Sequence, residues 1–84
     1  MANAAHDAVF TFEYDDAQRA RHIERALAPE VGDIASDRSS VSLARNGNEL
    51  EVTVAATDLV ALRAGLNTWF SLVTVAERAG DGVA

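Results

Sequence analysis

Hydrophobic and polar residues alternate along three short segments of the chain, at residues 8–14, 39–45 and 49–56. Such alternation predicts half-buried β-strands. Asn46-Gly47-Asn48 stands between the second and third segments and predicts a tight turn, and therefore a hairpin. The side chains expected to face the core are Ala8, Phe10, Phe12, Tyr14, Val41, Leu43, Leu50, Val52 and Val54.

A first helix is predicted between the first two strands, over about residues 16–28. The Asp15-Asp16 pair offers an N-terminal cap, and Pro29 is expected to end the helix. Residues 29–37 are then expected to form a loop, with Gly32-Asp33 turning the chain. The positions expected to face the core are Ala17, Ala20, Ile23 and Leu27 in the helix and Val31 and Ile34 in the loop.

The last predicted element is a long helix over residues 58–79, capped by Thr57 or Asp58. Between Leu59 and Ala76 its only charged residue is Arg63. At 100° per residue, one stripe of ordinary core width contains Leu59, Leu62, Leu66, Trp69, Phe70, Val73 and Ala76.

The opposite side of this helix is also small or apolar, where a monomer would carry Glu, Lys and Arg. Its residues are Val60, Ala61, Ala64, Thr68, Ser71, Leu72 and Val75. A second apolar face predicts a protein partner. A membrane span is the alternative, but Arg63 and Asn67 interrupt the window and no basic flank follows it. With no signal-peptide pattern at the N-terminus, we expect a cytoplasmic protein.

The order strand, helix, strand, strand, helix predicts an α+β domain. Both helices are expected to cover the single apolar face of a three-stranded, largely antiparallel sheet. The other sheet face is rich in Ser, Thr and Ala, so it either joins a second copy or faces solvent. We expect one domain over residues 8–79, with flexible ends at 1–7 and 80–84.

Thirteen acidic residues face seven basic ones, all of them Arg, giving a net charge of −6. An acidic surface without Lys favours a halophilic host, and a GC-rich genome that prefers Arg codons is the alternative. The negative charge argues against unaided binding of a phosphate backbone. Cysteine is absent, so disulfide and thiol chemistry are excluded.

The sequence offers little for catalysis or metal binding. His6 and His22 are the only histidines, and their spacing matches no zinc site. Glu13 with the Asp15-Asp16 pair is better explained by helix capping than by a bound cation. No Gly-rich phosphate loop or nucleophile motif is present. We therefore expect no enzyme activity, no metal and no cofactor.

Four arginines are candidates for contacts with partners. Arg19, Arg21 and Arg25 form a possible tRNA contact on the first helix, although a solvated helix face competes with that interpretation. Arg63, alone in a neutral helix, is expected to pair with a carboxylate or to reach a partner. Asn67, one turn later, is expected to hydrogen-bond the backbone or a neighbour.

The run Asp58-Leu59-Val60-Ala61-Leu62-Arg63-Ala64-Gly65-Leu66-Asn67-Thr68-Trp69-Phe70 resembles the D-L-x-x-L-R-A-x-L-N-S-Y/W helix of the Pcc family, with Val75-Ala76-Glu77 following it. This family supplies the small dimerising subunit of the KEOPS complex of archaea and eukaryotes. The resemblance covers about residues 9–79. Further matching segments are Phe12–Asp16, Leu27–Glu30, Arg38-Ser39 and Gly47–Leu50. Two positions depart from the pattern: Gly65 replaces a helix former, which could allow close helix packing, and Ser71 stands where relatives often carry Arg.

The resemblance implies a non-catalytic scaffold in the threonylcarbamoyladenosine modification of tRNA. It implies a homodimer whose two helices dock the Kae-type catalytic subunit, with indirect contact to tRNA and a possible further small subunit. The residues predicted to bind the partner are Val60, Arg63, Ala64, Asn67, Ser71, Leu72 and Val75. The alternative function is an autonomous small RNA-binding module.

Overall fold

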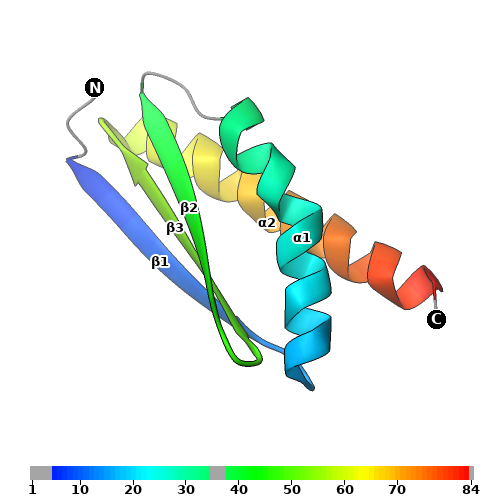
Figure 1. Ribbon diagram of the computed structural model, residues 1–84. Helices are drawn as coiled ribbons and strands as arrows, with labels where there is room; N and C mark the ends of the chain where they lie inside the picture. The colour runs from blue at the N-terminus through cyan, green and yellow to red at the C-terminus, as the bar shows by residue number, and fades with distance from the viewer. Residues whose placement is uncertain (1–4, 35–37, 84) are drawn as a thin grey trace.

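The computed structural model describes residues 5–34 and 38–83 and shows the predicted order of elements (Figure 1). The elements are β1 (His6–Glu13), α1 (Ala17–Ile34), β2 (Ser39–Asn46), β3 (Glu49–Ala56) and α2 (Leu59–Val83). The α+β class and the three-stranded antiparallel sheet are confirmed. Parts of the expected flexible ends and of the expected loop, at residues 1–4, 35–37 and 84, lie outside the described residues.

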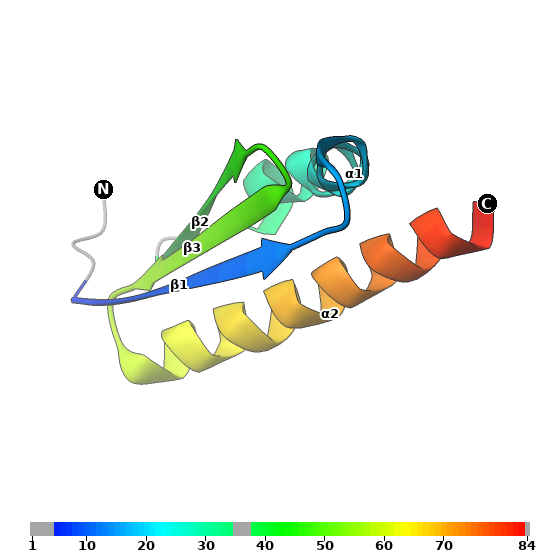
Figure 2. The ribbon, with the colours of Figure 1, turned by 90° about the horizontal axis from the view of Figure 1, so that it is seen from below.

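The sheet has the strand order β1-β3-β2, with β3 in the centre and antiparallel to both neighbours. Burial alternates along all three strands, so one face of the sheet is covered and the other is open. Both helices pack on the covered face, as the sequence predicts. In Figure 2, the sheet and α1 lie on one side of α2, and no other element lies on its far side.

The predicted hairpin between β2 and β3 is present, and its turn is the two residues Gly47-Asn48, since Asn46 belongs to β2. Gly47 has a φ of 64°, a conformation that a residue with a Cβ adopts only at a cost. The Asn48 side-chain amide donates to the Tyr14 carbonyl oxygen at 2.8 Å, and the Tyr14 amide donates to the Asn48 carbonyl oxygen at 3.0 Å. The turn is therefore tied to the end of β1.

The core lies between the sheet and the two helices. Its most deeply buried members come from α1 and from the central strand, since β3 is flanked on both sides. The buried cluster contains Ile23, Leu27, Leu50, Val52, Val54, Trp69, Val73 and Ala76. The strand positions and the first-helix positions predicted to face the core do so.

The predicted end of the first helix is wrong, because α1 continues through Pro29 to Ile34. Pro29 is exposed, so its ring meets solvent and disturbs no packing. The carbonyl of Arg25 that loses an amide partner also lies on an exposed residue, where water can satisfy it. Continuing the helix brings Val31 against the core one turn after Leu27. Gly32-Asp33 therefore lies inside a helix and does not turn the chain.

The core stripe of α2 is rotated relative to the prediction by about 50°. Leu59 and Phe70, predicted in the core, are exposed, whereas Ala61, assigned to the opposite face, is buried. Trp69, Val73 and Ala76 lie in the core as expected. Both sides of this helix are apolar, so periodicity alone defines the stripe poorly.

Gly65 explains the rotation. A Cβ atom added to Gly65 would lie 2.9 Å from Cγ1 of Val54 in the central strand. Real Cβ atoms essentially never approach a neighbour so closely, so only glycine allows α2 to approach β3 at this distance. The close helix packing anticipated at Gly65 is confirmed.

Changing Gly65 to Ala should therefore destabilise the chain, although Ala is the better helix former. We expect a loss of about 1 kcal/mol or more in the free energy of unfolding, because Val54 is fully buried and cannot easily move. Gly32→Ala in α1 is the matched control, since nothing lies within 4 Å of its added Cβ. It should stabilise the chain by about 0.5–1 kcal/mol. Urea unfolding measures both, and a Gly65→Ala variant as stable as Gly32→Ala would contradict the close approach.

Candidate protein-docking surface

The candidate site is the exposed side of α2, which we call the α2 outer face. It consists of Leu59, Val60, Arg63, Ala64, Asn67, Phe70, Ser71, Thr74 and Val75. Four of these side chains are large and apolar yet open to solvent: Val60 is 71% exposed, Val75 62%, Leu59 61% and Phe70 46%.

The α2 helix carries more apolar residues than the fold buries. The stretch Leu59–Ala79 is long and apolar enough to cross a membrane, yet only 17% of its most apolar window is buried inside the fold. A helix that served only the core would bury most of such a window. Contiguous exposed apolar surface of this kind marks an interaction site.

Six of the seven residues predicted to bind the partner lie on the α2 outer face. They are Val60, Arg63, Ala64, Asn67, Ser71 and Val75. Leu72 is the exception, because it is partly buried and packs against the core, on the side of the helix shared with Trp69 and Ala76. Asn67 also differs from expectation, since its side chain makes no hydrogen bond with any residue that the structure describes. Binding itself stays a prediction for all seven.

Leu59, Phe70 and Thr74 belong to the α2 outer face but were not predicted there. The Phe70 ring lies edge-on to two rings of β1, with centroids 4.6 Å from Phe10 and 6.2 Å from Phe12. Phe70 thus connects the core margin to the outer face. Both sides of α2 are apolar, so the hydrophobic pattern of the helix does not locate this boundary, which depends on how α2 packs against the sheet.

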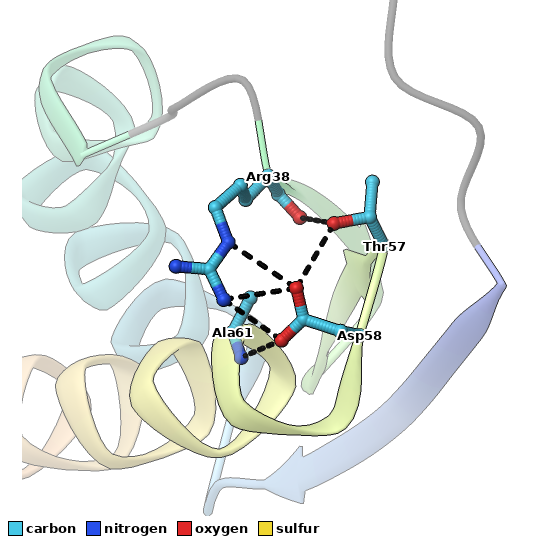
Figure 3. A network of polar contacts seen from close by, with 4 residues as sticks. All are labelled: Arg38, Thr57, Asp58 and Ala61. Atoms are coloured by element: carbon cyan, nitrogen blue, oxygen red, sulfur yellow. Dashed lines mark hydrogen bonds and ion pairs between the residues drawn. The ribbon is translucent and has the colours of Figure 1, made fainter.

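The beginning of α2 is fixed by a polar network around Asp58 (Figure 3). Asp58 Oδ1 accepts the Ala61 amide at 2.8 Å, so Asp58 is the N-terminal cap. The Arg38 guanidinium reaches both Asp58 oxygens at 2.9 Å, and the Thr57 amide donates to the Arg38 carbonyl oxygen at 2.8 Å. The Ala61 amide, together with Arg38, holds the pKa of the Asp58 carboxyl below its usual range. The network joins the chain before β2 to the start of α2.

A second polar contact fixes the far part of α2. The Tyr14 hydroxyl donates to Oε2 of Glu77 at 2.7 Å, across the space between β1 and α2. Partial burial and then this hydrogen bond raise the pKa of the Tyr14 hydroxyl well above its ordinary value. The Arg19 guanidinium lies 5.7 Å from the centre of the Tyr14 ring. The α2 outer face is therefore held at both ends.

The structure does not bring the three arginines of α1 together. Arg19 is partly buried against Tyr14, whereas Arg21 and Arg25 are exposed on another side of the helix. The predicted patch is thus reduced to two exposed arginines. The neighbouring Glu24 is engaged by Arg45 at 3.0 Å.

The open sheet face forms a second surface without a covering element. Across its middle, Val9 pairs with Thr53, which pairs with Ser42, and Val9 is 53% exposed. The end of this face nearest the hairpin is acidic, since Glu13 lies directly opposite Glu49 with Glu51 in the next row. The small residues in the middle of the open sheet face permit close approach of another sheet.

Among the described residues, no group of three or more acidic or histidine side chains is placed to hold a metal ion. His22 is exposed, and His6 lies in β1 and not in a terminal segment.

Comparison with known proteins gives a match over nearly the whole chain. The family described as "Transcription factor Pcc1" matches residues 7–81. A chain from the crystal structure of a binary complex, Gon7-Pcc1, has a TM-score of 0.86, with 16% identity, and the match covers 98% of this chain and 100% of that chain. At this identity the structural likeness shows the fold alone. No curated protein matches the chain.

Tyr14 yields a prediction on pH, because it is the only tyrosine and the chain has neither Lys nor Cys. Since folding raises its pKa, the folded chain keeps a proton that the unfolded chain loses above pH ~10. The stabilisation is therefore complete below pH ~10 and declines as the pH rises further.

Tyr14→Phe should lower stability at neutral pH by about 0.5–1.5 kcal/mol and remove this alkaline decline. Urea unfolding across the alkaline range tests the variant, and near-ultraviolet absorbance follows ionisation of the single tyrosine in the wild type. An ordinary titration near pH 10 in the folded wild type would contradict the contact with Glu77.

Proposed function

The chain belongs to the Pcc1 family, and from this premise we propose that it is a non-catalytic scaffold subunit of a KEOPS-type tRNA-modifying complex. The observation that carries the proposal is the α2 outer face, an apolar helix surface exposed on a folded domain. The chain lends no recognisable catalytic motif to the complex, and its contribution is binding and spacing.

The docked partner in this proposal is the Kae-type catalytic subunit, which adds the threonylcarbamoyl group to tRNA. Helices pack by fitting ridges of side chains into grooves, and the α2 outer face offers two exposed pairs at the ridge spacing of four residues, Val60-Ala64 and Ser71-Val75. The first helix, α1, packs against α2, and in this proposal its exposed side forms the second part of the docking surface. Contact with tRNA is then indirect, through the assembled complex.

A homodimer through the open sheet face is the second part of the proposal. The middle of this face carries small side chains around Thr53, and no described strand pairs with the outer edge of β1 or of β2. Two such faces can pack at the spacing usual for stacked sheets. The structural neighbour comes from the crystal structure of a binary complex with Gon7, and this supports a further small subunit as another occupant.

Direct binding of nucleic acid is the competing function. The chain would then be an RNA-binding module, or a transcription factor as the description of the family says. A net charge of −6 and the absence of basic residues from the described open sheet face disfavour it. That face also carries no aromatic side chain on which bases could stack. Weak binding of tRNA by the lone chain at physiological salt is expected.

A charge at Ala64 tests the docking surface. Ala64→Glu should weaken binding of the purified Kae-type subunit from the same host by at least ~100-fold, because docking would bury an unpaired carboxylate. Ala64→Ser is the neutral control and should bind like the wild type. Circular dichroism should show both variants folded, since Ala64 is exposed. Wild-type affinity in a folded Ala64→Glu variant, measured by calorimetry, would exclude this face.

The molecular mass of the protein in solution tests the dimer. It is measured at low and at molar salt, because the composition predicts a host with high internal salt. The wild type should have twice the 8.9 kDa protomer mass, and Thr53→Arg should be a monomer because Thr53 lies at the middle of the open face. Asn46→Arg, at the hairpin end of β2, is the control and should remain dimeric. A dimeric Thr53→Arg variant or a monomeric wild type, seen by light scattering, would contradict the interface.

A further inference from the structure

We propose that Arg63 selects the protein that docks on the α2 outer face, by pairing with an Asp or Glu carboxylate on a helix of that partner. The inference rests on the proposed function and adds the chemistry that the partner must present. It begins from the position of Arg63, the only charged residue of α2 between Leu59 and Ala76.

Arg63 is exposed and makes no hydrogen bond or ion pair with any residue that the structure describes. Arg38 is paired with Asp58, Arg45 with Glu24, and Arg19 lies against the Tyr14 ring, whereas Arg21, Arg25 and Arg78 are exposed like Arg63 and make no such contact with the described residues. Arg63 differs from these three because it is the only charged residue between Leu59 and Ala76. No carboxylate lies on the α2 outer face itself, whose members between Leu59 and Val75 are otherwise neutral. The guanidinium group of Arg63 therefore has its donors free.

The neighbours of Arg63 on the helix are mostly apolar. Leu59 and Val60 lie one turn before it, and Phe70 lies two turns after it on the same side. A partner that covers these side chains must also remove water from the guanidinium group. A charge buried without a partner is strongly unfavourable, so the docking protein has to supply an acceptor at this point.

A carboxylate fits this requirement better than a phosphate does. Phosphate backbones are held by clusters of basic residues, whereas the next basic residue on α2 is Arg78, about 22 Å along the helix. The chain as a whole repels phosphate, with a net charge of −6. A single guanidinium group within an apolar surface is suited to one carboxylate, because the two planar groups can form two parallel hydrogen bonds.

This pairing gives specificity as well as affinity. A helix with matching shape but no carboxylate opposite Arg63 would leave the guanidinium unpaired and be rejected. The carboxylate also fixes the register of a partner helix along α2, since the apolar side chains alone allow it to slide.

The test measures binding of the purified Kae-type subunit to Arg63→Glu and Arg63→Met. Met retains the length and the apolar stem of the side chain and removes the charge. Arg63→Met should bind at least ~30-fold more weakly, and Arg63→Glu more weakly still, because each leaves the partner's carboxylate unpaired. Asn46→Arg, a change of charge at the exposed hairpin end of β2 and outside both helices, should stay within about threefold of the wild type.

A rescue identifies the carboxylate. Each Asp and Glu on the partner's docking helices is changed to Arg and tested against Arg63→Glu, and one change should restore affinity to within tenfold of the wild type. Equal binding of Arg63→Met and the wild type, or failure of every rescue, would overturn the proposal. Normal assembly of Arg63→Glu with loss of tRNA binding by the complex would also overturn it, in favour of a phosphate contact.

The outcomes separate this inference from the function on which it rests. If Ala64→Glu abolishes docking while Arg63→Met does not, the docking surface stands and only the charge pairing fails. If the wild type does not bind the catalytic subunit, both are overturned.

Discussion

The close packing of α2 on the central strand, at Gly65 and Val54, sets the arrangement on which the rest of the structure depends. A Cβ at Gly65 would meet the Val54 side chain at 2.9 Å, so α2 can lie this near to β3 only with this residue turned inward. Fixing one residue of a rigid helix fixes the direction of all the others, at 100° per residue. Ala61, Trp69 and Val73 are thereby buried, and Val60, Arg63 and Phe70 are left outside.

Polar contacts also fix the position of α2. Asp58 with Arg38 holds the start of α2, and Tyr14 with Glu77 holds its far part, so a long helix is fixed at three places on a small domain. A docking surface that is already ordered loses little conformational entropy when a partner binds. The exposed apolar side chains of α2 are thus presented on a firm support, as expected for a subunit that joins larger proteins.

The sequence was sufficient for the class, the strands and the hairpin, because their alternation has a period of two and one face is clearly apolar. It failed at Pro29, where the outward position of the ring decides whether a helix continues, and sequence does not reveal that position. It also misplaced Leu59, Phe70 and Leu72, because both sides of α2 are apolar and hydrophobicity cannot choose between them. Gly65 carried the missing information, but its meaning depends on Val54, which lies in a different element.

The central claim is that the α2 outer face is covered by a protein partner. Radical footprinting with mass spectrometry, which labels exposed side chains, tests it directly when the free chain is compared with its complex with the Kae-type subunit. The account predicts strong labelling of Leu59, Val60 and Phe70 in the free chain and marked protection of all three in the complex. Equal labelling of these side chains in the two states would contradict it.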